Sequence, residues 1–248
     1  MSKVIVLASG GVDSSLVMAK LLREGHEVYP LYSNYNQYAY ENEAKSVRMV
    51  VDWLRRNTLM WGKPNTMYYL EPVTEVHINT GIGTIAACPG RVLSFVGAAC
   101  IWAFTKGWTE GKIAIGIHKG DKDQDSCRVG YEDSLNETVK SLTQGCMEII
   151  TPLMGMTREE MAQEVAEIGI PWEILYNCYW GVPCGWQSKN MDYLCPGCRR
   201  KLEAMVYVKS PLVSRIVATV EGKGGKFAGP NCFIMDTMVT RRDWKRLT

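Results

Sequence analysis

KVIVLASGGVDSS, which runs from Lys3 to Ser15, predicts a strand, a glycine turn and the start of a helix. Its first half is a short β-branched run, and the segment after Asp13 stays apolar on more than one face until Gly25. A second short strand from Glu27 to Tyr32 and a second helix up to Leu54 follow. This order predicts a parallel sheet with right-handed crossovers.

The rest of the chain continues the alternation. Further strands are predicted at Thr66–Leu70, Lys112–Ile117 and Met147–Ile150, and further helices at 91–106, Glu132–Leu142, Thr157–Gly169 and Arg199–Lys209. The helix that opens at Thr157 has a capping box with Glu160. We expect an α/β fold, an open doubly wound, Rossmann-like parallel sheet in residues 1–170, with residues 171–248 as a small C-terminal appendage packed on it.

Charge and hydropathy exclude several classes of protein. Twenty-eight Lys and Arg against 26 Asp and Glu give a net charge of +2, which supplies no broad basic surface for nucleic acid or acidic membranes. Val4–Leu7 is too short for the apolar region of a signal peptide, and Val92–Phe104 is shorter than the roughly 20 residues of a membrane span. We expect a cytoplasmic protein without a direct nucleic-acid or membrane partner, and 91–106 as a buried helix.

Four of the nine cysteines gather near the C-terminus. Cys195-Pro196-Gly197-Cys198 is a Cys-x-x-Cys knuckle, and Cys178 and Cys184 precede it. Four thiolates can close a tetrahedral Zn²⁺ site, which would hold two short loops together in place of a hydrophobic core. An iron–sulfur cluster, a redox pair and unliganded thiols are the alternatives.

The glycine turn has the chemistry of an anion site. Glycines let the backbone approach phosphate, and the amides at a helix start, with the hydroxyls of Ser14 and Ser15, favour negative charge. The loop has neither the Gly-Lys-Ser/Thr ending of a Walker loop nor the spacing of a dinucleotide fingerprint. The alternative is a purely structural turn that binds no ligand, in which the Asp13 carboxylate caps the start of the helix.

Ser9-Gly10-Gly11-x-Asp13-Ser14 resembles the pyrophosphate loop (PP-loop) of the ATP-pyrophosphatase superfamily. The resemblance implies that the protein binds ATP with Mg²⁺ and splits it into AMP and pyrophosphate while adenylating a substrate. It also implies that Asp13 lies near the magnesium and phosphates. The residues that would bind the nucleotide are Ala8, Ser9, Gly10, Gly11, Asp13, Ser14 and Ser15.

The loop and the four cysteines together resemble the 7-cyano-7-deazaguanine synthase family, from about Lys3 to Arg200. Further local matches are Tyr35-Asn36-Gln37, Pro89-Gly90-Arg91, Gly116 with Asp121, Cys127-Arg128 and Thr151-Pro152-Leu153. The chain departs from the family pattern at Asn36, where the family has glycine, at Val92, where it has asparagine, and at His118-Lys119-Gly120. Ten residues also separate Cys184 from Cys195, a longer spacing than the family's compact cluster.

The resemblance implies an ATP-dependent ligase that converts 7-carboxy-7-deazaguanine and ammonia to the nitrile through an adenylated carboxylate and an amide. The candidate catalytic residues are Asp13, Ser14, Lys119 and Asp121, and the candidate substrate contacts are Arg91, Asp121, Asp125 and Arg128. The arginines can fork onto a carboxylate or phosphate, and an aspartate can accept hydrogen bonds from a guanine-like edge. The alternative without a substrate is that Arg91 caps or pairs at the start of a helix. For Asp121 to Asp125, it is a run of charged residues that faces solvent.

Three alternative functions stay open. Lys119 stands where the family has an acid, so the reaction could stop in part at 7-amido-7-deazaguanine. A tRNA-thiolating enzyme of the same superfamily would need a basic face or an RNA-binding domain. A nucleotide-binding interaction module would release no pyrophosphate. The oligomeric state is also open, a homodimer included.

Overall fold

The computed structural model describes residues 1–58, 68–78, 90–118, 131–179 and 195–213. Six strands form one sheet in the order β3-β2-β1-β5-β6, and β4 also pairs with β2. Each of these pairs is parallel, as the sequence predicts. The strands are β1 (Lys3–Leu7), β2 (Glu27–Asn34), β3 (Tyr69–Leu70), β4 (Thr74–His77), β5 (Gly111–Ala114) and β6 (Met147–Ile150).

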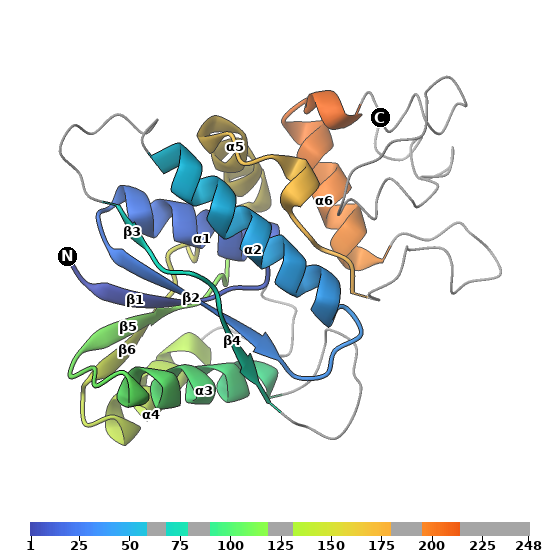
Figure 1. Cartoon of the computed structure of the whole chain (residues 1–248). Helices are drawn as coiled ribbons and strands as arrows, with labels where there is room; N and C mark the ends of the chain where they lie inside the picture. The colour runs from blue at the N-terminus through green and yellow to red at the C-terminus, as the bar shows by residue number, and fades with distance from the viewer. Residues whose placement is uncertain (59–67, 79–89, 119–130, 180–194, 214–248) are drawn as a thin grey trace.

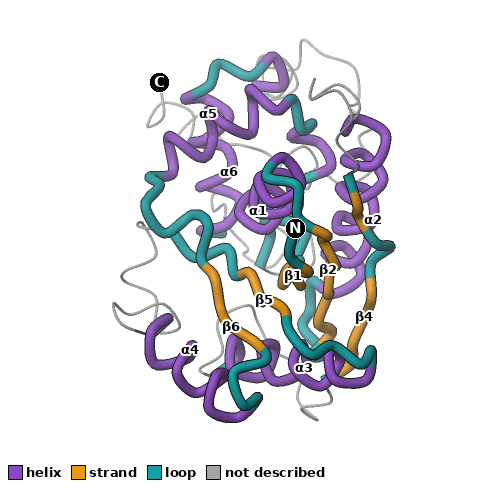
Figure 2. The backbone as a smooth tube through the Cα atoms, turned by 90° about the vertical axis from the view of Figure 1, so that its left-hand side faces the viewer, coloured by secondary structure: helices purple, strands orange, loops and turns teal. Residues whose placement is uncertain are grey.

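Helices cover both faces of the sheet, which confirms the doubly wound α/β fold (Figure 1). One face carries α1 (Val12–Arg23), α2 (Tyr40–Asn57), α5 (Arg158–Ile168) and α6 (Pro196–Tyr207). The other carries α3 (Arg91–Thr105) and α4 (Tyr131–Leu142), and Figure 2 shows the same two layers from the side. A 3-10 turn, η3 (Trp172–Ile174), lies between α5 and α6 in the chain.

The alternation of β1 explains the two layers. Val4 and Val6 pack into the core beneath α1 and α2, whereas Ile5 packs with the residues of α3 and α4 on the opposite face. All three side chains are 0% exposed. Burial of each such side chain contributes roughly 1.5–3 kcal/mol, so β1 fixes both faces of the sheet at its centre.

The chain order places a topological switch point at the carboxyl end of β1. The chain leaves β1 through α1 to reach β2 on one side, and later returns through α3 to β5 on the other. Open parallel sheets bind ligands where the winding direction changes in this way. The glycine turn after Leu7 lies at this point.

One strand was missed, β5 ends at Ala114 and not at the predicted Ile117, and one predicted environment is corrected. β4 was not expected, because Thr74–His77 has no buried alternation and each residue stays partly or fully exposed. The expectation of a buried 91–106 helix holds for one face of α3 only, since Ile101 is 68% and Phe104 83% exposed. In the described residues, no helix combines the length and the hydropathy that a membrane crossing requires.

Residues 171–179 and 195–213 share the core of α1, α2 and α5. Trp172, Leu175, Leu202 and Met205 are buried in the same cluster as Leu16 and Val165. The expectation that a metal here replaces a hydrophobic core is therefore wrong for the described residues. α6 starts at Pro196, three residues before its predicted start, because Cys195 caps it and proline is favoured in the first turn.

The predicted capping box of α5 is confirmed. The Thr157 side chain accepts a hydrogen bond from the Glu160 amide, and the Glu160 carboxylate accepts one from the Thr157 amide. Gly169 ends the helix with φ of 84°, as its position after Ile168 indicates.

Candidate functional site

A cavity of about 290 Å³ opens at the carboxyl ends of β1, β2 and β5. One wall is the glycine turn with the first turn of α1, from Ala8 to Ser14. The other walls come from the end of β2, from the start of α3, from Ile115–His118 after β5, from Tyr176–Tyr179 and from α6. The cavity therefore gathers segments that are far apart in the sequence at the switch point of the sheet.

The glycine turn is held from behind by two distant segments. The Gly10 carbonyl accepts hydrogen bonds from the Ser46 hydroxyl of α2, at 2.8 Å, and from the Tyr176 amide, at 2.8 Å. Gly10 has φ of 73°, and a Cβ there would lie 2.7 Å from the Val47 nitrogen. The turn therefore needs glycine at this position for its conformation and for its contact with α2.

Gly10→Ala should lower the free energy of unfolding by roughly 2–4 kcal/mol, because left-handed strain adds to a collision with backbone. Gly25→Ala is the matched control, since Gly25 has φ of 86° with nothing within 4 Å of its added Cβ. It should cost only the strain, about 1–2 kcal/mol. Denaturant unfolding measures both, and equal losses would mean that the contact with α2 is unimportant.

The first turn of α1 has the arrangement of an anion site. The N-cap residue of α1 is Gly11, and no side-chain hydrogen bond from it caps the helix. The amides of the first turn can therefore bind a ligand. The Ser14 hydroxyl accepts a hydrogen bond from the Ser9 amide at 3.1 Å. Asp13 lines the cavity, and a Cβ on Gly116 after β5 would lie 3.1 Å from the Asp13 Cβ, so this approach is close.

Not every residue of the predicted loop faces the cavity. Ala8, Ser9, Gly11, Asp13 and Ser14 line it. Gly10 and Ser15 are not among the lining residues. Gly10 packs on α2, and Ser15 is 0% exposed, with a buried hydroxyl that has no hydrogen-bond partner among the described residues. Asp13 lies in the first turn of α1 and is not its N-cap residue.

Three of the four predicted cysteine ligands come together. The Sγ atoms of Cys178, Cys195 and Cys198 lie within 4.8 Å of one another and are buried, and those of Cys178 and Cys195 are 4.0 Å apart. Two thiolates on a tetrahedral Zn²⁺ would lie about 3.8 Å apart. The Cys198 and Tyr179 amides both point at the Cys195 sulfur, at 3.4 and 3.5 Å, as suits a thiolate. The arrangement could hold a metal ion.

The described cavity wall carries more positive than negative side chains. Arg91, Arg158, Arg200 and Lys201 line it, against Asp13 and Glu43. Lys201 is 3% exposed, and its Nζ donates to the Leu175 carbonyl at 2.6 Å. A wall of this charge suits a polyphosphate or another anion.

Tyr176 lies beside both the cysteines and Glu43. Burial raises the pKa of its phenol far above its ordinary value, and the nearby charges of Cys178, Glu43 and Cys198 raise the pKa further. The phenol therefore stays protonated across the physiological pH range.

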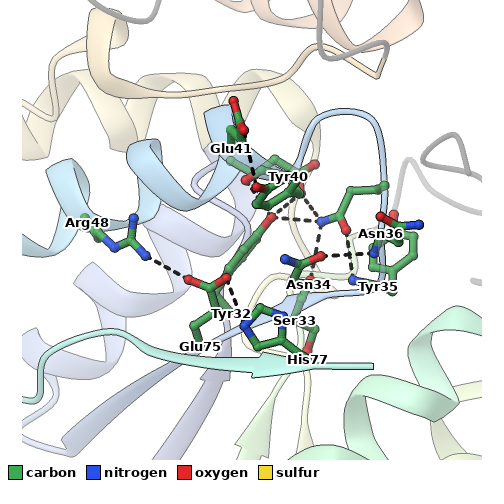
Figure 3. A network of polar contacts seen from close by, with 12 residues as sticks. Tyr32, Ser33, Asn34, Tyr35, Asn36, Tyr40, Glu41, Arg48, Glu75 and His77 are labelled. Carbon is green, nitrogen blue, oxygen red and sulfur yellow. Dashed lines mark hydrogen bonds and ion pairs between the residues drawn. The ribbon is translucent and has the colours of Figure 1, made fainter. Parts of the chain in front are cut away.

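A polar network forms the cavity wall at the end of β2 (Figure 3). The Glu43 Oε2 accepts a hydrogen bond from Gln37 Nε2 at 2.8 Å. The Tyr32 hydroxyl lies 3.3 Å from the same oxygen and 2.9 Å from the Tyr40 carbonyl, and these two acceptors share its one hydrogen. Gln37 Oε1 accepts from the Tyr35 amide at 2.9 Å. Asn36 between them has φ of 66°, a conformation that glycine and asparagine tolerate best, which explains why this chain can have asparagine where the similar family has glycine.

The described residues include only some of the predicted site residues. Lys119, Asp121, Asp125, Arg128 and Cys184 lie outside the described residues. Arg91 starts α3, lines the cavity, and donates through Nη1 to the Tyr35 hydroxyl at 3.4 Å. Sequence analysis missed Glu43 and Tyr176 as cavity residues. Glu43 lies among the other polar residues that open α2, so only its position on the cavity wall distinguishes it.

Comparisons with known proteins agree with the motifs. A protein-family model described as queuosine biosynthesis protein QueC matches residues 3–209. The 7-cyano-7-deazaguanine synthase of Chlorobium luteolum is 27% identical over 217 residues, covering 82% of this chain and 91% of that protein. The synthase of the same name from Aquifex aeolicus is 27% identical over 218 residues, covering 82% and 95%. Among solved structures, a predicted subunit of a tRNA methyltransferase from Methanocaldococcus jannaschii is 15% identical with a TM-score of 0.40, over 67% of this chain and 75% of that one.

Proposed function

The chain belongs to the family of the queuosine biosynthesis protein QueC, and we propose that it is an ATP-dependent ligase that makes 7-cyano-7-deazaguanine from 7-carboxy-7-deazaguanine and ammonia. The observation that carries the proposal is the uncapped glycine turn at the switch point, with Asp13 and Ser14 on the wall of a cavity that is lined by basic side chains. Relatives named for this product at 27% identity support the same activity.

The chemistry explains why ATP is needed. A carboxylate is a poor acyl donor, because its leaving group would be oxide. Attack of a carboxylate oxygen on the α-phosphorus releases pyrophosphate and leaves AMP on the carboxyl group. Ammonia then attacks the acyl carbon, AMP departs with that oxygen, and the amide forms after loss of a proton. In a second round, the amide oxygen attacks the α-phosphorus of a second ATP and releases pyrophosphate. Loss of AMP with that oxygen, and of the two protons on nitrogen, gives the nitrile.

The described residues have matching roles in this proposal. The amides at the start of α1, with Ser9 and Ser14, hold the phosphates in line, and Asp13 lies where Mg²⁺ would neutralise them. Such catalysis is positioning and charge neutralisation, and it needs no side-chain nucleophile. Arg91 would contact the deazaguanine. Lys119, Asp121, Asp125 and Arg128 remain candidates from the sequence.

The cysteines would hold one Zn²⁺. Cys178, Cys195 and Cys198 supply three buried sulfurs at suitable separations, and we assign Cys184 as the fourth ligand. The metal would be structural, closing the segment after α5 onto α6. In this assignment, residues 1–170 form the ATP domain, residues 171–248 carry the zinc, and the enzyme acts in the cytoplasm without direct contact to nucleic acid.

A time course of product masses tests the proposal. Incubation with ATP, Mg²⁺, ammonium and 7-carboxy-7-deazaguanine should give AMP, pyrophosphate and, at the end, the nitrile. Absence of AMP when all substrates are present would contradict the ligase. Because Lys119 replaces an acid of the family, amide that persists under excess ATP would instead indicate a reaction that stops in part at the amide.

A further inference from the structure

Glu43 is a carboxylate on the cavity wall that the proposed chemistry does not use. It comes from the start of α2, and one of its oxygens, Oε2, is fixed by Gln37 Nε2 and the Tyr32 hydroxyl. Gln37 is itself fixed: it is 3% exposed, it accepts from the Tyr35 amide, and it donates to the Ser33 carbonyl at 3.3 Å. The position of Glu43 is therefore set by the backbone at the end of β2, part of which is labelled in Figure 3.

This carboxylate has unmet capacity for hydrogen bonds. Within the described part of the chain, no hydrogen bond reaches its other oxygen, Oε1, although a carboxylate has room for about four donors. Burial raises the pKa of Glu43, and the bonds from Gln37 and Tyr32 and the charge of Arg91 offset only part of that rise. A ligand that brought N–H donors would offset the cost of burying this charge.

The surroundings of Glu43 fit a flat heterocycle. Tyr35 and Phe95 line the cavity with ring centroids 5.2 Å apart, and they offer an aromatic wall. Two polar atoms on the same wall are buried and have no hydrogen-bond partner among the described residues: Arg91 Nε and the Ser33 hydroxyl. Ser33 is 7% exposed. Buried polar groups of this kind are normally paired, and a ligand in the cavity would supply partners for both.

We propose that Glu43 and Arg91 together read the 2-amino-4-oxopyrimidine edge of the deazaguanine. Glu43 accepts the ring N–H and one N–H of the exocyclic amine, and Arg91 donates to the ring carbonyl. This inference rests on the proposed function, since it names the part of that site that selects the base. An adenine edge offers one donor beside a ring acceptor, which an ionised carboxylate repels, so Glu43 discriminates the substrate base from the nucleotide.

Paired ligands and variants test this assignment. Calorimetry measures the Kd of 7-carboxy-7-deazaguanine and of its analogue without the exocyclic amine, for the wild type, Glu43→Gln and Glu41→Gln. Glu41 is an exposed glutamate two residues away on α2 and does not line the cavity, so it is the matched control. We expect the wild type and Glu41→Gln to bind the analogue roughly 10- to 100-fold more weakly than the parent.

In Glu43→Gln the two ligands should differ by less than about 3-fold, because the carboxylate that reads the amine is gone. The KM for ATP should not change, since the nucleotide does not meet this residue. An unchanged preference for the amine in Glu43→Gln, or a raised KM for ATP with normal base binding, would overturn the assignment. If the variant unfolds on thermal melting, Glu43→Asp replaces it, and the shorter side chain should weaken the preference in the same way.

The same experiment separates this inference from the proposed function. If the wild type forms AMP and nitrile, but Glu43→Gln keeps the wild-type preference for the amine, only the base assignment is contradicted. Protein that shows the coupling but forms no AMP supports the assignment and contradicts the ligase. Protein that binds neither base contradicts both.

Discussion

Asp13→Ala should lower the rate of AMP and pyrophosphate formation by roughly 10³-fold, as expected when one group that positions and neutralises charge in a transition state is removed. Asp13 lies in the first turn of α1, lines the cavity and is only partly buried. The loss should therefore come from the bound phosphates and their Mg²⁺, not from the fold. The free energy of unfolding should fall by only about 0.3–1 kcal/mol, the usual contribution of an acid at a helix start.

Asp133→Ala is the matched control for this prediction. Asp133 also lies in the first turn of a helix, α4, but it is exposed and is not among the cavity residues. Its removal should cost similar stability with unchanged turnover. The comparison uses pyrophosphate release for activity and denaturant unfolding for stability. Turnover retained in Asp13→Ala would show that the glycine turn is not the phosphate site.

The centre of the sheet could be predicted from sequence because local and long-range forces agree there. The β-branched run of β1, the glycine turn and the apolar α1 indicate one structure, and every residue of Val4–Val6 is fully buried. β4 could not be predicted, because its four residues stay partly or fully exposed and its pairing with β2 depends on distant chain. Edge strands of this kind lack the alternation that a sequence pattern needs.

The part of the candidate site that lies in one continuous motif could be predicted. The part that the fold assembles from distant segments could not. Ser9, Asp13 and Ser14 stand within six positions, and the structure places them on one wall. Glu43 shares its part of the cavity with Arg91 and Phe95, which are about fifty residues later in the chain. Its sequence neighbours Glu41 and Asn42 are also polar, so only its position on the cavity wall distinguishes it.

Cys198→Ser should remove the metal and destabilise the protein. A thiolate that closes a buried tetrahedral site cannot be replaced by a hydroxyl without loss of affinity, and binding at such sites is coupled to folding. We expect about one zinc per chain in the wild type, much less in the variant, and a loss of more than about 4 kcal/mol in the free energy of unfolding. Elemental analysis and chelator-dependent unfolding measure both quantities.

Cys146→Ser is the control, because Cys146 packs at the edge of the other core cluster, with α3 and α4. It should keep the metal. Iron with acid-labile sulfide, or no metal in wild-type protein purified without chelator, would contradict the zinc assignment.

The metal should also influence ATP, because the chain connects the two sites within a few residues. Cys178 follows Tyr176 by two positions, and the Tyr176 amide donates to the carbonyl of Gly10 in the glycine turn. Gly197 next to Cys198 packs against the Asn177 carbonyl so closely that a Cβ would collide with it. Loss of the metal should loosen this segment and weaken the hydrogen bond from the Tyr176 amide to the Gly10 carbonyl. The KM for ATP should therefore rise in Cys198→Ser and stay unchanged in Cys146→Ser. If the metal only stiffens α6, both variants should keep the KM of the wild type.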